Sequence, residues 1–203
     1  KIHQKEIIRL DVNEVALILD KAESGDGLTE HQKCYNNATK TRDVALLTLF
    51  LGTGIRISEL VGLNVTDINF ENNSFVVTRK GGSRSILYFT EETADALADW
   101  IDLRSTLPID KNKNALFISL QNRRMSTRAI QELVKKYAKI VTPLKHITPH
   151  KLRSTFGTNL YQSTGDIYAV ADFLGHKDIN TTRKHYAAIN ENSRREIVKS
   201  VKL

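Results

Sequence analysis

The chain has 203 residues, of which 40% are hydrophobic, and it carries a formal net charge of +7. This length allows one domain with a proper core, or two small ones. Its longest largely apolar run, residues 44–51, which Thr48 interrupts, is far shorter than the ~20 residues of a transmembrane helix. Its basic balance favours a polyanionic partner.

Three single residues bear on the context of the protein. Cys34 is the only cysteine, so an intramolecular disulfide is excluded and a reducing, cytoplasmic setting is expected. The first residue is Lys1 and the only methionine is Met125. We therefore expect the chain to be a fragment of a longer protein.

The first part of the chain predicts three helices. Asp11 and Glu14 have the spacing of a capping box that opens a helix. The face of this helix that we expect to be buried carries Val12, Val15, Ile18, Leu19 and Ala22. Residues 24–39 are polar and contain glycine, which predicts a loop. Residues 44–51 predict a buried helix that ends at the following glycines, and a short helix is expected from Arg56 to Leu63.

Strand signals follow these helices. Short β-prone runs separated by turn residues cover residues 67–70, 75–79 and 85–89. They predict a three-stranded antiparallel meander with Lys80 at a hairpin tip. Thr90 is the expected cap of the next helix, and residues 115–120 are a candidate for a further strand.

Basic residues concentrate in the second half of the chain. Residues 121–153 hold nine lysines and arginines against one acid, Glu132, whereas the first thirty residues hold seven acids against four basic residues. Ser126 opens a strongly amphipathic helix within this basic segment. Charge alone would fit a solvated lysine-rich helix face as well as a nucleic-acid surface.

The remaining residues also predict helices. Thr148 and Pro149 are the expected cap and first residue of a helix that ends near Gly165. Asp166 opens the next helix, and a last one starts at residue 180 or 181 and carries Tyr186. The fold class predicted for the chain is α+β, mainly α-helical, with a small three-stranded antiparallel sheet.

Taken singly, the chemically suggestive residues are weak signals. His150 and Arg153 lie at i and i+3 of a predicted helix, but so short a pattern arises easily by chance. Arg56 follows a glycine turn, Lys80 lies in the hairpin and His176 follows a helix end. Each of them could be an ordinary surface or core residue, so the information lies in the set and its order.

That set, in chain order, is Thr53 to Leu60 (TGIRISEL), the hairpin lysine, His150 to Arg153 (HKLR), Leu174 to His176 (LGH) and Tyr186. It resembles the tyrosine recombinase family, also called phage-type integrases. The resemblance covers nearly the whole chain, and it implies the tyrosine recombinase catalytic-domain fold. It also implies that residues 1–203 form one catalytic domain, with an N-terminal DNA-binding domain upstream.

The resemblance implies a site-specific DNA recombinase with a role for each matching residue. Tyr186 would attack a DNA phosphodiester and form a 3′-phosphotyrosyl link, which stores the bond energy for rejoining without ATP. Arg56 and Arg153 would bind the non-bridging phosphate oxygens in place of a metal ion. Lys80 would protonate the departing 5′ oxygen.

The other matching residues would support this chemistry. His150 resembles a general base or proton relay, His176 would donate a hydrogen bond to the scissile phosphate, and Glu59 would orient the site. No cofactor and no metal are expected. Glu59 could instead be a surface helix residue, and Arg79 and Arg84 compete for the role of the hairpin lysine.

Two departures from the family pattern are visible. His176 and Tyr186 are ten residues apart, one more than in many members. Ser154 stands where a histidine often follows the motif arginine. The first departure predicts a different connection into the tyrosine helix, and the second affects none of the assigned roles.

The resemblance also implies the partners. Double-stranded DNA is the expected substrate, bound by a homotetramer on paired sites that is monomeric when free, at the nucleoid in the cytoplasm. Residues 194–203 carry a short apolar stripe and are expected to pack on a neighbouring protomer, although self-docked or frayed ends are equally compatible. Integration of a phage or mobile element, its excision, and resolution of chromosome dimers all stay open, as does the DNA target.

Two other functions are compatible with parts of the sequence. Residues 166–188 could form a helix-turn-helix of a non-catalytic DNA-binding regulator, but that leaves Arg56, Lys80 and the histidines unexplained. A type IB topoisomerase-like enzyme would use related tyrosine chemistry to relax supercoils.

Overall fold

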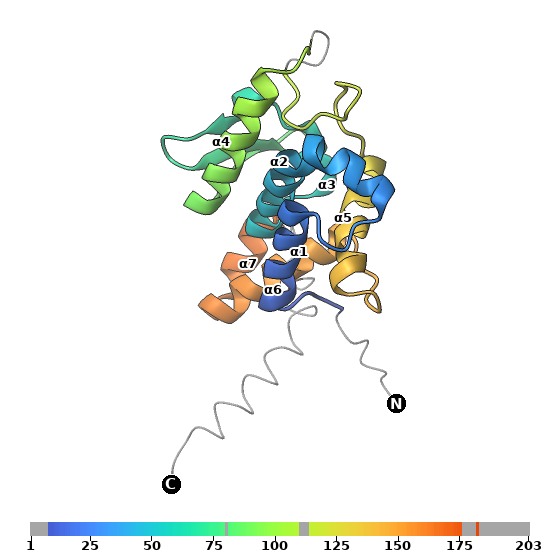
Figure 1. Ribbon diagram of the computed structural model, residues 1–203. Coiled ribbons are helices and arrows are strands. Elements are labelled where there is room, and N and C mark those ends of the chain that lie inside the picture. Colours follow the sequence, from blue (N-terminus) through green and yellow to red (C-terminus); the bar gives the residue numbers. More distant parts are fainter. Residues whose placement is uncertain (1–7, 80, 110–113, 176–181, 183–203) are drawn as a thin grey trace. The chain divides into compact units, whose positions relative to one another are not determined.

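The structure is a computed structural model that describes residues 8–79, 81–109, 114–175 and 182 (Figure 1). Its elements in chain order are α1 (Val12–Ser24), α2 (Glu30–Thr53), α3 (Ile57–Gly62), a 3-10 turn η1 (Val65–Asp67), β1 (Ile68–Asn69), β2 (Ser74–Thr78), β3 (Arg84–Tyr88), α4 (Glu91–Ser105), α5 (Thr127–Val141), α6 (Pro149–Thr164) and α7 (Ile167–Leu174). The predicted α+β class is therefore confirmed. The chain forms two compact units, residues 1–155 and 156–203. Within the described ranges, no helix combines the length and the apolar character needed to cross a membrane.

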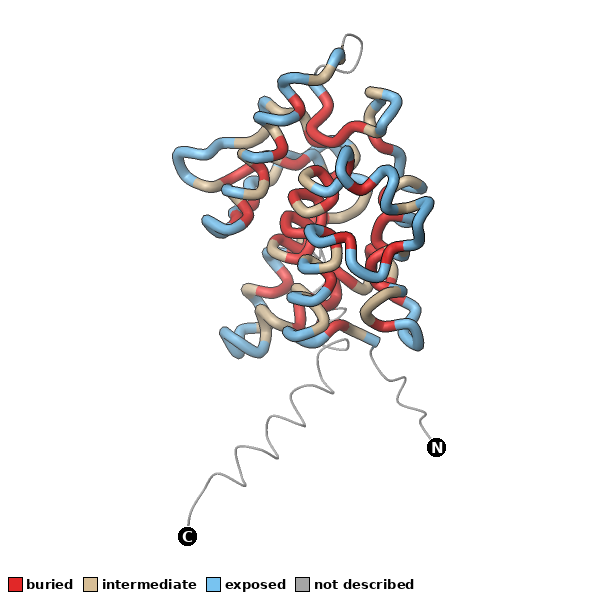
Figure 2. Tube along the Cα trace, in the orientation of Figure 1, coloured by how far each residue is buried: buried red, intermediate tan, exposed pale blue. Residues whose placement is uncertain are grey.

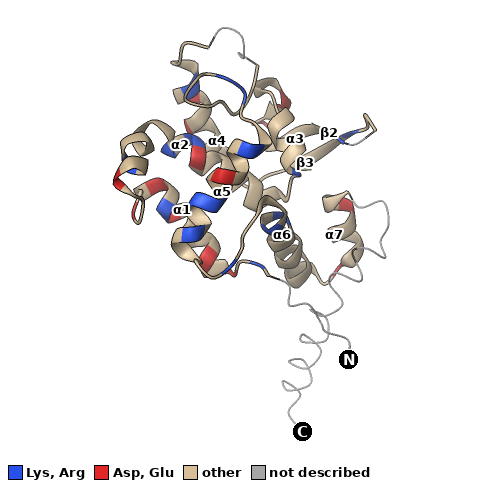
Figure 3. Ribbon diagram, turned by 90° about the vertical axis from the view of Figure 1, so that its right-hand side faces the viewer, with Lys and Arg blue, Asp and Glu red and all other residues tan. Residues whose placement is uncertain are grey.

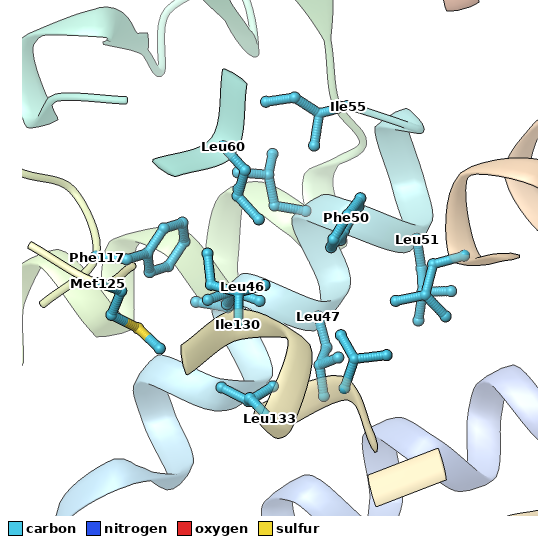
Figure 4. Packing of buried hydrophobic residues seen from close by; sticks show 14 of the residues in the cluster. Leu46, Leu47, Phe50, Leu51, Ile55, Leu60, Phe117, Met125, Ile130 and Leu133 are labelled. Atoms are coloured by element: carbon cyan, nitrogen blue, oxygen red, sulfur yellow. The ribbon is translucent and has the colours of Figure 1, made fainter. Parts of the chain in front are cut away.

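The second half of α2 forms the centre of the core of the first unit. Leu46, Leu47, Leu49 and Phe50 have no exposed surface, and Figure 2 shows this part of the helix in the buried colour. In the close-up of Figure 4, Leu46 and Phe50 lie among side chains from α3, α5 and residues 117–125. A helix that is apolar all round must be covered on every side, and each such side chain contributes about 1.5–3 kcal/mol on burial.

The loop predicted at residues 24–39 is confirmed only for residues 25–29 and is wrong from residue 30 onward, because α2 already begins at Glu30. Thr29 caps the helix: its hydroxyl accepts from the amide of Gln32 at 3.3 Å, and the Gln32 side chain accepts from the amide of Thr29 at 3.0 Å. These reciprocal bonds form a capping box. The first turns of α2 are mostly exposed, so their polar residues need no apolar partner and hide the helix from a search for apolar periodicity.

The capping box predicted for α1 is confirmed, but the buried face is narrower than expected. The Asp11 side chain accepts from the amide of Glu14, and the Glu14 carboxylate accepts from the amide of Asp11, both at 2.8 Å. Ile18 and Ala22 are buried, whereas Val12 is 72% exposed. Val12 opens the first turn, and the fully buried positions of α1 begin only later in the helix.

Residues 115–120 do not form the predicted strand and make only isolated bridges to the rest of the described chain. Two side chains of α4 satisfy the carbonyls that a sheet partner would have bound. Trp100 Nε1 donates to the carbonyl of Leu116, and Arg104 Nε donates to that of Ala115, both at 2.9 Å. The apolar sequence of this run therefore reflects burial against the core and not strand pairing.

The three-stranded antiparallel meander is confirmed, with strand order β1-β2-β3. Phe75 on β2 faces Leu87 on β3, and both are buried on the core side of the sheet. The β2–β3 hairpin turns through Gly81 and Gly82, whose φ angles of +98° and +81° favour glycine. Lys80, the residue expected at the tip, lies outside the described residues.

The second unit contains α6 from Phe156 onward and the whole of α7. Asp166 caps α7 by accepting from two amides of its first turn, and Gly175 ends it in the left-handed conformation, as the sequence predicted. Val170 and Leu174 form a small apolar cluster with partly buried residues of α6 such as Phe156. The helix predicted after α7 falls almost wholly outside the described residues.

Candidate active site

The turn between α2 and α3 determines the position of Arg56. α2 ends at Thr53, and Gly54 follows with a φ of +59°, donating its amide to the carbonyl of Phe50 at 3.1 Å. This left-handed cap is the usual way to stop a helix sharply, and glycine adopts it without strain. Arg56 is then the cap residue of α3. Its main chain is therefore held between two helix ends.

Glu59 holds the side chain and the main chain of Arg56 at once. Its Oε1 accepts from Arg56 Nη1 at 2.8 Å, and its Oε2 accepts from the Arg56 amide at 3.0 Å. The Glu59 side chain is 3% exposed, whereas that of Arg56 is 36% exposed. A surface role for Glu59 is thereby excluded, because a carboxylate this deeply buried needs the charged partner that it has. The guanidinium of Arg56 remains partly exposed to solvent.

Arg153 reaches the same turn from α6. It is buried, at 7% exposed, and its Nη1 donates to the carbonyl of Gly54, two residues before Arg56. The structure thus brings Arg56, Glu59 and Arg153 together at the α2–α3 turn, although the arginines are 97 positions apart in the sequence. His150 lies three residues before Arg153 in the first turn of α6 and is exposed.

Two guanidinium groups fixed beside one turn can bind an oxyanion. The planar fork of arginine matches the oxygens of phosphate, and a side chain already held by a carboxylate or a carbonyl needs little reordering when charge develops. The described part of the chain contains no group of three histidine, cysteine or acidic residues arranged to hold a metal ion. Three predicted members of the site, Lys80, His176 and Tyr186, lie outside the described residues, and their roles stay predictions.

Part of the basic charge of residues 121–153 serves the fold. Arg124 donates to the carbonyls of Val61 and Leu63, at 2.8 and 2.7 Å, and Lys136 pairs with buried Asp43 at 3.0 Å. Other basic residues of this segment remain exposed: Arg123, Arg128, Lys135 and Lys139. Figure 3 shows basic residues on α5. The segment is therefore partly structural and partly a positively charged surface.

Sequence reasoning missed the anchor of Arg153. The sequence places Gly54 at a helix end, but nothing local to residues 52–54 indicates which side chain donates to its carbonyl. The double role of Glu59 had a visible signal, since a glutamate three residues after the cap residue Arg56 is the second half of a capping-box pattern.

Comparison with known sequences gives a consistent family. The sequence model of the Phage integrase family matches residues 9–193. Tyrosine recombinase XerC of Alcanivorax borkumensis is 34% identical over 174 residues, which is 86% of this chain and 53% of that protein. The XerC of Psychromonas ingrahamii is 37% identical over 142 residues, or 70% of this chain and 47% of that protein. The chain thus spans about half the length of these relatives.

Solved structures share the fold. The crystal structure of XerA recombinase has a TM-score of 0.76 at 26% identity and covers 97% of this chain and 66% of its own. The Tn1549 transposon integrase in complex with transposon right end DNA has a TM-score of 0.67 at 27% identity, with 98% of this chain and 67% of that chain covered. The fold expected from the sequence, that of a tyrosine recombinase catalytic domain, is confirmed by these similarities.

Proposed function

Because the chain belongs to the phage integrase family of tyrosine recombinases, we propose that it is a site-specific recombinase that cleaves and rejoins DNA strands through a 3′-phosphotyrosyl intermediate. One observation carries the proposal: Arg56, held by Glu59, and Arg153, held by the Gly54 carbonyl, meet at one turn. A phosphodiester bound there would have its negative charge stabilised as the transition state forms.

The reaction then assigns the remaining residues. Tyr186 attacks the phosphorus atom, and the bond to the 5′ oxygen of the next nucleotide breaks. Lys80 gives its proton to that oxygen, which is a poor leaving group as an alkoxide. His150 accepts or relays the proton of the tyrosine, and His176 donates a hydrogen bond to the phosphate. Attack by a 5′ hydroxyl reverses these steps and releases Tyr186.

The substrate that we propose is double-stranded DNA, bound by four protomers on two paired sites, with the free protein monomeric. The exposed basic residues of the first unit would contact phosphates, so binding should weaken as salt rises. We propose that residues 1–203 act as one catalytic domain and work on nucleoid DNA in the cytoplasm. Mobile-element DNA is one candidate target, since the similar Tn1549 integrase is solved in complex with transposon end DNA.

Two alternative functions make different predictions. A DNA-binding regulator would form no covalent adduct with any DNA. A type IB topoisomerase-like enzyme would form the adduct and relax supercoiled DNA, but it would not join strands from two separate sites. A strand-exchange assay with two labelled sites therefore separates recombination from relaxation.

The proposal is tested by incubation with nicked DNA in which the cleaved fragment diffuses away, followed by a denaturing gel. The wild-type protein should give a slow-migrating covalent protein–DNA band. Tyr186→Phe should give none, because it lacks the attacking hydroxyl, while gel-shift affinity stays nearly unchanged. Tyr168→Phe is the matched control, since Tyr168 is a 65% exposed tyrosine of α7, and it should form the adduct normally. An adduct that persists in Tyr186→Phe would show that the nucleophile is another residue.

A further inference from the structure

The first turns of α6 are attached to the segment that leads into α1. The main-chain amide of Leu10 donates to Thr155 Oγ1 at 3.1 Å, across 145 positions of sequence. Leu10 and Thr155 are each 1% exposed. Thr155 Oγ1 in turn donates to the carbonyl of Lys151 at 2.9 Å, one helical turn earlier. The hydroxyl proton is thus committed to the helix, and its oxygen accepts the bond from the lead-in segment, residues 9–11.

A second link joins the same two regions. Lys145, in the loop between α5 and α6, places its Nζ 2.6 Å from Glu14 Oε1 and 2.7 Å from Oε2. The same ammonium group donates to the carbonyl of Arg9 at 3.3 Å. Glu14 is also the capping-box residue that binds the amide of Asp11. The start of α1 therefore holds the loop that leads into α6.

These two links lie on either side of the site residues of α6. His150 and Arg153 fall between Lys145 and Thr155 in the chain, and Arg153 Nη1 donates to the carbonyl of Gly54. Three attachments therefore define where the first turns of α6 lie within the first unit. A small shift of α6 would displace the Arg153 guanidinium. Because electrostatic stabilisation of a transition state depends steeply on the position of the donor, this displacement would weaken the stabilisation.

We propose that Thr155 is a positioning residue for the reaction. Its hydrogen bond to Leu10, together with the Lys145–Glu14 ion pair, positions Arg153 beside the scissile phosphate. This inference rests on the proposed function, because it assumes that Arg153 binds that phosphate. Thr155 itself touches neither substrate nor reacting atoms. Removing its hydroxyl should slow strand cleavage while leaving DNA affinity unchanged, since no charged surface group is altered.

The test compares Thr155→Val with Thr155→Ser in the full chain. Valine keeps the branched shape and removes the acceptor, and we expect single-turnover cleavage of nicked DNA to slow by about ten- to hundredfold, the range for a small misplacement of a catalytic group. Serine restores the hydroxyl and should return the rate to near the wild-type value. In a methylphosphonate substrate, a methyl group replaces one charged non-bridging oxygen. The slower cleavage by Thr155→Val should then largely disappear, because the phosphate carries less negative charge for Arg153 to stabilise.

Thr142→Val is the matched control, since Thr142 is also buried and bonds its own helix, with Oγ1 donating to the carbonyl of Ala138 at 3.0 Å. It should cleave at the wild-type rate. Lys145→Met cuts the second link at the surface and should slow cleavage in the same substrate-dependent way, which decides the matter if Thr155→Val fails to fold.

Equal defects of the Thr155 and Lys145 variants on both substrates, or no defect on either, would overturn the positioning role. Adduct formation and two-site strand exchange by the wild type would still uphold the recombinase function. If the wild type forms no adduct at all, the proposed function fails first, and the role of Thr155 fails with it.

Discussion

At the scale of single residues, Glu59 shows how one carboxylate can both build a helix and prepare a site. It ends the first turn of α3 by binding the amide of Arg56, and it fixes the Arg56 guanidinium at 2.8 Å. The side chain is almost fully buried, so its charge is tolerated only because of that arginine. The same two contacts between Glu59 and Arg56 therefore start the helix and position the guanidinium of the site.

Glu59→Gln separates these two contributions. A glutamine carbonyl can still accept from the Arg56 amide, but the neutral side chain no longer holds the guanidinium by charge. We expect the cleavage rate to fall by about tenfold and the free energy of unfolding to fall by about 1–3 kcal/mol, measured by single-turnover cleavage and urea denaturation.

Glu132→Gln is the control for this change. Glu132 lies 3.7 Å from Arg128 in an exposed pair, with the side chains 56% and 82% exposed. Exposed pairs contribute at most about 1 kcal/mol, so its stability should stay close to that of the wild type. A Glu59→Gln protein that cleaves as fast as the wild type would remove Glu59 from the positioning of Arg56.

At the scale of elements, the helix that ends at the site is joined to α5 by a buried ionic cluster. The Asp43 carboxylate of α2, which has no exposed surface, accepts from Arg42 Nε and Nη2 at 3.0 and 2.6 Å. From α5 it accepts from Lys136 Nζ at 3.0 Å and from Tyr137 Oη at 2.9 Å. With each partner in place the buried charge is satisfied, and loss of one partner should destabilise the α2–α5 contact.

Tyr137→Phe tests this contact and its pH dependence. Burial, and then the negative charge of Asp43, raise the pKa of the Tyr137 phenol above its ordinary value. The folded protein therefore favours the protonated phenol, so its contribution is complete below the unfolded pKa of about 10 and is lost as pH rises above it. We expect the variant to be less stable by about 1–2 kcal/mol at pH 7, and this difference should shrink above about pH 10.

Urea denaturation at a series of pH values measures both quantities. Tyr88→Phe, on the exposed side of β3 with 56% of the residue accessible, serves as the control and should follow the wild-type curve. A difference between Tyr137→Phe and the wild type that stays constant from pH 7 to about pH 11 would contradict the raised pKa as the source of the pH dependence.

At the scale of the whole molecule, the proposed tetramer requires contacts between protomers bound to DNA. Residues 194–203 lie outside the described residues. Their sequence contains an apolar stripe, formed by Ile197, Val198, Val201 and Leu203. A stripe of this kind needs a surface to cover it. We expect that surface to belong to a neighbouring protomer in the DNA-bound tetramer proposed above.

Deletion of residues 193–203 should therefore impair synapsis more than binding of one protomer to one site. Gel-shift titration separates the two, because single-site complexes and paired-site complexes migrate differently. A second variant replaces Ile197 and Val201 by serine in the full chain, so it keeps the charges of the tail and removes part of its apolar stripe. It should show the same loss of paired complexes as the deletion. Unchanged synapsis in both proteins would assign the tail to its own protomer.

The amino-acid sequence by itself determined the features that depend on neighbouring residues. Four such features are confirmed: the capping box of Asp11 and Glu14, the helix end within residues 52–54, the start of α6 at Pro149 and the antiparallel meander. The order of chemically distinctive residues also identified the family. The first turns of α2 are polar, so the search for apolar periodicity predicted a loop there.

Only the tertiary structure decided which residues of these elements are buried and which long-range hydrogen bonds they form. Val12 is exposed although it fits an apolar face, and residues 115–120 are held by side chains of α4 and not by a sheet. The Gly54 carbonyl meets Arg153, and the Leu10 amide meets Thr155, across 99 and 145 positions of sequence. No local pattern specifies such pairs, because any of many buried donors could satisfy a given acceptor, and only packing of the complete core selects the one that does.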